Sequence, residues 1–232
     1  MNTVCLSENA HTILKTALAG KGYELIEIRK TDAVYSAVSS HGDIYLCKIG
    51  DGIVVAPEQL PLIRDMLLRC GVRFTPGASA LGGRYPENVK YNAAQVGRFL
   101  IHRIHSTDPV VLEKAGEHGL EPVSVRQGYT KCSLVIVDDR SVITSDAGLA
   151  RSLKQLGIDV LPVSVGHVKL PGFPYGFLGG ASGRLGEEVI FNGDLSAHPD
   201  FLRIKEFIER RGLRVTWFPE YPLEDIGSII QL

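Results

Sequence analysis

The sequence predicts an α/β fold: a five-fold pseudo-symmetric α/β propeller of strand–strand–helix–strand (ββαβ) units, whose ring is closed by the C-terminal strand. The first observation is a repeat, in which a charged helical stretch, a glycine and alternating apolar residues follow one another five times, around Gly22, Gly71, Gly119, Gly157 and Gly212. The second is a short apolar run before each helical stretch. The third is that the first copy lacks an opening strand, whereas a spare strand follows the fifth copy.

Each of these glycines stands where a helix must end in a left-handed residue, and the alternation that follows is typical of a strand with one buried face. A strand is also expected before each helix, at 4–6, 53–55, 99–104, 142–144 and 189–191. Polar residues that favour helix starts follow these runs. They include Ser7, Asp108 with Pro109, Ser145 with Asp146, and His198 with Pro199.

A further strand is expected to open most copies, at 35–39 with 43–46, 89–93, 131–137 and 177–182. Residues 225–232 provide the spare strand, and its pairing with the first copy would leave no unpaired sheet edge. No linker rich in proline, glycine or serine separates the copies. The sequence therefore predicts one domain over residues 1–232.

Composition argues against several functional classes. The chain has 25 Lys and Arg against 26 Asp and Glu, without runs of either sign, so nucleic acid is not an expected partner. No apolar stretch approaches the roughly 18 residues of a membrane span, and no signal peptide is evident, so a cytoplasmic protein without membrane contact is expected. The four cysteines are scattered without metal-ligand spacing. Neither a metal site nor a cofactor is predicted.

In such a ring the opening strands crowd around the central axis, so polar residues at their ends are expected to form one axial pocket for a small-molecule ligand. Asp225, in the final strand, or Asp32 is a candidate partner for a cationic substrate. The glycines of 179–183 could present backbone N–H groups to an anion, or could only relieve crowding near the axis. The candidate substrate-binding residues are Asp32, Asn92, Gln127, Lys131, Lys169, Gly180, Ser182 and Ser228.

Cys132 is the candidate nucleophile, because Lys131 precedes it and a neighbouring cation lowers a thiol's pKa. His167 lies outside any apolar periodicity and is followed by a lysine and a Pro-Gly turn, so it is a candidate general acid or base. The alternative interpretation is that Cys132 packs within its strand and that His167 only forms a hydrogen bond in a loop.

Several segments resemble a known family: QGYTKCS at 127–133, HVKLPG at 167–172, YGFLGGASG at 175–183, HPD at 198–200 and DIGSI at 225–229. Together with the repeat, they resemble the pentein, or guanidine-group modifying enzyme, fold, and within it a bacterial family without an assigned activity. The fold includes arginine deiminases, amidinotransferases and dimethylarginine dimethylaminohydrolases, and also ribosome anti-association factors that catalyse nothing. His167-Val168-Lys169 resembles the His-Leu-Lys segment around the catalytic histidine of the dimethylarginine hydrolases.

The resemblance implies a cysteine nucleophile on the last strand, but this chain has Gly227-Ser228 there and no cysteine after Cys132. Two hypotheses remain. In one, the protein is a cysteine-dependent C–N hydrolase or amidinotransferase-like enzyme acting on a guanidino, amidino or related small molecule, with Cys132, His167 and Asp225 as its catalytic residues. In the other, it is a non-catalytic pentein that binds a small ligand or a protein partner. Homodimerisation is left open.

Overall fold

The computed structural model describes residues 2–232, so Met1, where the predicted domain begins, lies outside the described residues. The fold is mixed α/β and contains five sheets of three strands each. In every sheet the middle strand pairs antiparallel with an inner strand and parallel with an outer strand. The predicted α/β fold and its five repeated units are confirmed at this level.

In four units the chain runs from an inner strand through a middle strand and a helix to an outer strand; in the remaining unit the inner strand comes from the C-terminal end of the chain. The inner strands are β15 (Ile230–Gln231), β3 (Leu46–Ile49), β6 (Ala94–Val96), β9 (Val135–Asp138) and β12 (Ser182–Leu185). The middle strands are β1 (Thr3–Ser7), β4 (Gly52–Val55), β7 (Phe99–His102), β10 (Ser141–Thr144) and β13 (Glu188–Phe191). The outer strands are β2 (Glu24–Ile28), β5 (Arg73–Pro76), β8 (Glu121–Ser124), β11 (Asp159–Pro162) and β14 (Arg214–Thr216).

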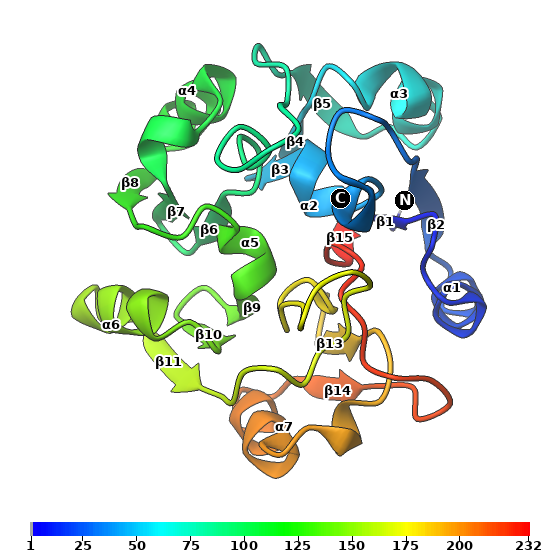
Figure 1. Ribbon diagram of the computed structural model, residues 1–232, viewed down its shortest axis with the longest axis vertical. Coiled ribbons are helices and arrows are strands. Elements are labelled where there is room, and N and C mark those ends of the chain that lie inside the picture. Colours follow the sequence, from blue (N-terminus) through cyan, green and yellow to red (C-terminus); the bar gives the residue numbers. More distant parts are fainter. Residues whose placement is uncertain (1) are drawn as a thin grey trace.

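Five longer helices lie at the rim of the molecule, and the short helices and β15 lie near its middle (Figure 1). The rim helices are α1 (Thr12–Gly20), α3 (Leu60–Arg69), α4 (Pro109–Glu117), α6 (Ala147–Gln155) and α7 (Phe201–Glu209). The short helices are α2 (Gly42–Tyr45) and α5 (Thr130–Ser133), and 3-10 turns occur at Ser36–Val38, Ile104–Ser106 and Leu195–Ala197. No helix within residues 2–232 is both long and apolar enough to cross a membrane.

The rim helices pack on the sheets in the same way in every unit. Each helix buries two residues spaced four apart, which lie on one face of a helix. These pairs are Leu14 and Leu18, Ile63 and Leu67, Val111 and Ala115, Leu149 and Leu153, and Ile204 and Ile208. The glycines after the helices have positive φ angles, from 64° at Gly119 to 83° at Gly22, as their left-handed position requires.

Two of the predicted helix starts are observed as side-chain caps. Asp108 accepts hydrogen bonds from the backbone N–H groups of the first turn of α4, and Asp146 does so for α6. The other two lie further along the chain, since α1 begins after His11 rather than Ser7 and α7 begins after Asp200.

The predicted opening strands are wrong in their boundaries. The inner strands begin at Leu46, Ala94, Val135 and Ser182, which is three to five residues after the predicted starts at 43, 89, 131 and 177. The segments before β3 and β9 form the short helices α2 and α5 instead, and those before β6 and β12 form turns. The reason lies in tertiary contacts. Polar side chains of these segments form hydrogen bonds with one another across the middle of the molecule, and the alternation of apolar residues along the sequence does not reveal such contacts.

Candidate functional site

Polar side chains from different units meet where the chain enters the inner strands. Asp43 comes from α2, Asn92 precedes β6, Cys132 comes from α5 and Ser228 precedes β15. Asp43, Asn92 and Ser228 are fully buried, and Cys132 is 3% exposed. We call these four residues, with Lys131, Asp225 and His41, the axial cluster. Its members come from segments up to 187 residues apart, counted from His41 to Ser228, so only the fold brings them together.

Asn92 connects three of the entering segments. Its Nδ2 donates to the backbone oxygen of Asp43 at 2.9 Å and to the Sγ of Cys132 at 3.0 Å. Its Oδ1 accepts from the backbone nitrogens of Lys131 at 2.8 Å and Cys132 at 3.3 Å. The amide therefore holds α5 in place and contacts the thiol directly.

Ser228 links Lys131 to the carboxylate of Asp43. Ser228 Oγ donates to Asp43 Oδ2 at 2.6 Å, and Lys131 Nζ donates to Ser228 Oγ at 3.1 Å. The other carboxylate oxygen, Asp43 Oδ1, is buried and has no hydrogen-bond partner among the described residues. An unpaired buried acceptor is costly to a fold, so it marks a position where a ligand donor would be favourable.

Asp225 provides a second buried carboxylate. It accepts hydrogen bonds from the backbone nitrogens of Phe177 at 2.9 Å and Gly227 at 3.0 Å. His41 Nδ1 lies 3.6 Å from Asp225 Oδ1, and both side chains are buried. Gly180 leaves the space that Asp225 occupies, since a Cβ there would lie 2.0 Å from Asp225 Oδ1.

Burial and mutual charge shift the pKa of every titratable group in the cluster. Burial raises the pKa of Cys132 well above its usual value, and the negative charges of Asp43 and Asp225 raise it further. Burial raises the pKa of Asp43, and it raises that of Asp225 to about 6. Burial lowers the pKa values of Lys131 and His41. The thiolate enrichment expected from Lys131 is therefore wrong for this resting arrangement, because two carboxylates and burial outweigh one cation.

Two tyrosines lie beside the cluster. The hydroxyls of Tyr35 and Tyr129 are 3.0 Å apart, and Asn88 Nδ2 donates to the Tyr129 hydroxyl at 2.7 Å. Burial raises the pKa of Tyr35, and the nearby Cys132 and Asp225 raise it further. Phe177 packs near Tyr129 with a centroid distance of 6.2 Å. One side of the cluster is thus aromatic.

The other side of the cluster faces a cavity of about 400 Å³. Residues of all five inner strands or their flanks line it, among them Lys131, Ser182 and Ile229. This cavity lies at the predicted position of an axial pocket, and it contains the predicted substrate-binding residues Lys131 and Ser182.

The sequence matches the family model described as "Family of unknown function (DUF6873)" over residues 5–230. The chain belongs to this family. No curated protein matches it.

Solved structures share the fold of this DUF6873 chain. A mutant dimethylarginine dimethylaminohydrolase from Pseudomonas aeruginosa, complexed with citrulline, is 10% identical with a TM-score of 0.59, covering 99% of this chain and 98% of its own. Agmatine deiminase from C. jejuni is 8% identical with a TM-score of 0.57, covering 99% and 92%. An amidinotransferase of the saxitoxin biosynthetic pathway from Microseira wollei is 13% identical with a TM-score of 0.52, covering 89% and 73%. The predicted resemblance to penteins is confirmed, and at these identities it is one of fold.

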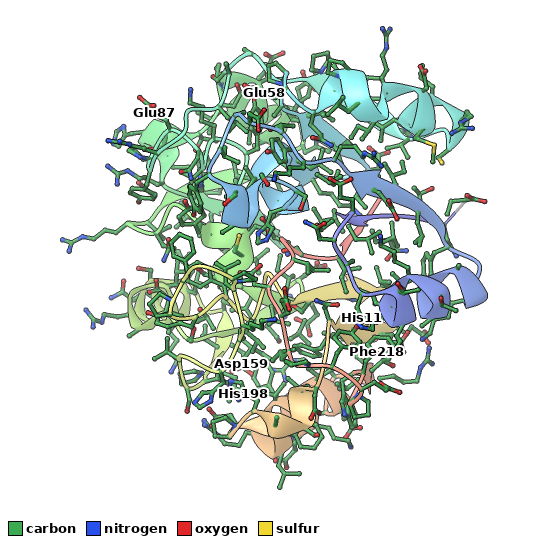
Figure 2. The ribbon with its side chains drawn as sticks, turned by 45° about the vertical axis from the view of Figure 1, so that its right-hand side comes forward. His11, Glu58, Glu87, Asp159, His198 and Phe218 are labelled. Atoms are coloured by element: carbon green, nitrogen blue, oxygen red, sulfur yellow. The ribbon has the colours of Figure 1, made fainter. Side chains whose placement is uncertain are left out.

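The side chains of four predicted site residues of the DUF6873 chain take no part in the hydrogen bonds of the axial cluster. His167 is exposed and packs edge-on against His198 at a centroid distance of 5.2 Å. Figure 2 shows His198 close to α7, away from the middle of the molecule. Asp32 is exposed, Gln127 donates to Asp146 Oδ2 at 2.9 Å, and Lys169 pairs with Glu224 at 3.3 Å.

The segment that carries His167 still supports the cluster through its backbone. The backbone nitrogen of Asp225 donates to the Lys169 oxygen at 2.9 Å, and Gly176 donates to Val168 at 2.7 Å. Gly180, Asn92, Lys131, Ser182, Asp225 and Ser228 lie in or beside the cluster, as does Cys132.

Sequence reasoning did not single out His41 and Asp43 as site residues. A signal was available: His41-Gly42-Asp43 directly precedes an apolar run that enters an inner strand, as Lys131-Cys132 does. Assigning 43–46 to a strand concealed it. Within residues 2–232, no group of three or more His, Cys, Asp or Glu side chains is arranged to hold a metal ion.

Proposed function

We propose that this protein is a thiol-dependent hydrolase or transferase that acts on a small guanidino or amidino cation, with Cys132 as nucleophile. One observation carries the proposal. The Cys132 thiol is held by Asn92 beside the two buried carboxylates of Asp43 and Asp225, and Asp43 Oδ1 lacks a partner among the described residues.

The charges favour a cationic, donor-rich ligand. Besides burial, the charge of Asp225 raises the pKa of Asp43, and both carboxylates raise the pKa of Cys132. A planar guanidinium or amidinium group offers several N–H donors and a positive charge, which match carboxylates geometrically. Such a ligand would pair with Asp43 Oδ1 and place its central carbon near the thiol.

The chemistry then follows from the two groups in contact with the ligand. The Cys132 proton passes to Asp43, Sγ forms a bond to the central carbon, and the C–N bond breaks with its electron pair on the leaving amine. Asp43 returns the proton to that amine. Water, or an amine acceptor in a transferase, then loses a proton to Asp43 as it attacks the carbon. The C–S bond breaks with its electron pair on sulfur, and Asp43 returns the proton to restore the Cys132 thiol. Asp225 and His41 orient the cation in this scheme.

Non-catalytic binding of a cation is the second candidate, and a specific observation favours it. The pKa of Cys132 is raised and His167 lies outside the cluster, so the resting site lacks the activated thiol and histidine of the first hypothesis. In this case the carboxylates would only hold the ligand.

Incubation with guanidino and amidino compounds, dimethylarginine and agmatine among them, separates the two candidates. The enzyme proposal expects amine or ammonia release and a covalent adduct on Cys132 by peptide mass spectrometry, both lost in Cys132→Ser. Binding by calorimetry without product or adduct would favour the second candidate. Absence of both binding and turnover across the panel would contradict both.

The proposal also predicts a pH dependence. Because Asp225 has a pKa raised to about 6, it is largely protonated below that pH and ionised above it. Affinity for a guanidinium probe is therefore expected to rise as pH increases through about 6 and then to level off. Asp225→Asn should remove most of this rise in calorimetry between pH 5 and 8. An affinity that falls with pH in the wild-type protein would contradict the assignment.

A further inference from the structure

The cavity of about 400 Å³ lies on the side of the β-hairpin turns, away from the two tyrosines. Gly50 joins β3 to β4, Gly97 joins β6 to β7, Asp139 joins β9 to β10 and Gly186 joins β12 to β13, and all four line it. A cavity of this size accommodates a small ligand together with water.

Three cations line this cavity: Lys48 from β3, Lys131 from α5 and Arg184 from β12. None of them is within ion-pair distance of a carboxylate among the described residues. Their hydrogen bonds go to neutral oxygens: Lys48 to the Gln231 carbonyl at 2.6 Å, Lys131 to Ser228 and Arg184 to the Gly186 carbonyl at 3.1 Å. Asp139 is the only acidic residue in the described lining.

We propose that this cavity binds a small oxyanion, a carboxylate or a phosphate, through Lys48, Lys131 and Arg184. The three cations leave spare donors, and Arg184 has both terminal guanidinium nitrogens available for a bidentate contact. Because Asp139 is the one carboxylate beside these three cations, the described lining has a net charge of +2. The surrounding protein lowers the pKa of Lys48 and Lys131, so an anion would also relieve the cost of keeping both charged.

This site is distinct from the thiol side of the cluster. The carboxylates of Asp43 and Asp225 do not line the cavity, whereas Lys131 does, and its ammonium group donates to Ser228 Oγ. An anion in the cavity would thus be bound by Lys48, Lys131 and Arg184, and a cation on the thiol side by Asp43. The oxyanion site is independent of whether Cys132 performs chemistry.

Calorimetric titration of the wild-type protein with inorganic phosphate and, separately, succinate tests the proposal at constant ionic strength. We expect binding of at least one probe, and the stronger of the two identifies phosphate or carboxylate as the preferred chemistry. The double variant Lys48→Gln/Arg184→Gln should bind it at least about tenfold more weakly, since each cation contributes a charge-assisted hydrogen bond. Lys30→Gln, an exposed cation outside the cavity, should bind as the wild type does.

Arg184→Gln alone keeps the test valid if the double variant does not fold, because this exposed side chain donates only to a turn carbonyl. It should still weaken binding severalfold. Cys132→Ser should leave oxyanion affinity unchanged, which separates this site from the proposed thiol chemistry. Binding of neither probe to the wild type, or equal affinity in Arg184→Gln and the wild type, would overturn the proposal.

Discussion

Cys132 shows how far a residue's chemistry depends on its neighbours. Its sequence context, after a lysine, predicts an acidified thiol, whereas in the fold burial and the charges of Asp43 and Asp225 act in the opposite direction. Lys131 does lie in the cluster, but its ammonium group bonds to Ser228 rather than to the sulfur. One adjacent residue does not decide a pKa when burial and charges from other units act on the titrating atom in the opposite direction.

Removing the charge of Asp43 should lower the pKa of Cys132. In Asp43→Asn, alkylation of Cys132 by iodoacetamide is expected to be severalfold faster at pH 8, with its midpoint shifted to lower pH. Peptide mapping across pH 6 to 10 measures the rate at this cysteine. Asp65→Asn, an exposed position on α3, is the matched control and should not change the rate. An unchanged or higher pKa in Asp43→Asn would show that Asp43 is not the dominant charge beside the thiol.

At the scale of the elements, the helical turns that enter the inner strands distinguish the structure from the sequence prediction. The middle strands, rim helices and terminating glycines follow local rules, so they could be predicted. The entering turns follow contacts between units, such as those of Asn92 with α5. A prediction from the local alternation of apolar residues therefore starts the opening strands too early in the sequence.

The turn before β12 packs so closely that only glycine fits. A Cβ on Gly180 would lie 2.0 Å from Asp225 Oδ1 and force this carboxylate to move. Gly180→Ala is expected to lower the free energy of unfolding by about 2 kcal/mol or more and to weaken binding of a guanidinium probe. Urea denaturation and calorimetry measure the two effects.

Gly83→Ala is the control for this substitution, because a Cβ on Gly83 meets no atom within 4 Å and its φ angle is not left-handed. It should change the free energy of unfolding by less than about 0.5 kcal/mol. Equal stability of the Gly180→Ala and Gly83→Ala variants would contradict the close packing at Asp225.

At the scale of the whole molecule, the two ends of the chain form one sheet. β15 pairs antiparallel with β1, with Val4 opposite Gln231 and Cys5 opposite Ile230, and the backbone nitrogen of Leu232 donates to Thr3 at 2.9 Å. The sequence predicted this pairing from a missing strand at one end and a spare strand at the other. The same pairing brings Ser228 to Asp43.

Deleting residues 229–232 should therefore destabilise the protein as a whole. The deletion removes the buried Ile229 and Ile230 and leaves β1 with an open edge, so a loss of about 4 kcal/mol or more is expected in denaturation experiments. Cys5, which is buried in the intact protein, should become reactive toward a thiol reagent. Ile230→Val is the control and should cost only about 1 kcal/mol. Continued protection of Cys5 after the deletion would contradict this account.

The sequence alone determined the repeat, the α/β class and the glycines at which the rim helices end. These follow from periodicity and from glycine and cap positions, which act over a few residues. Only the tertiary structure decided that Asp43 and His41 join Cys132, that His167 packs against His198 instead, and that burial raises the pKa of the thiol. Side-chain direction and desolvation depend on atoms from distant segments, and no local pattern encodes them.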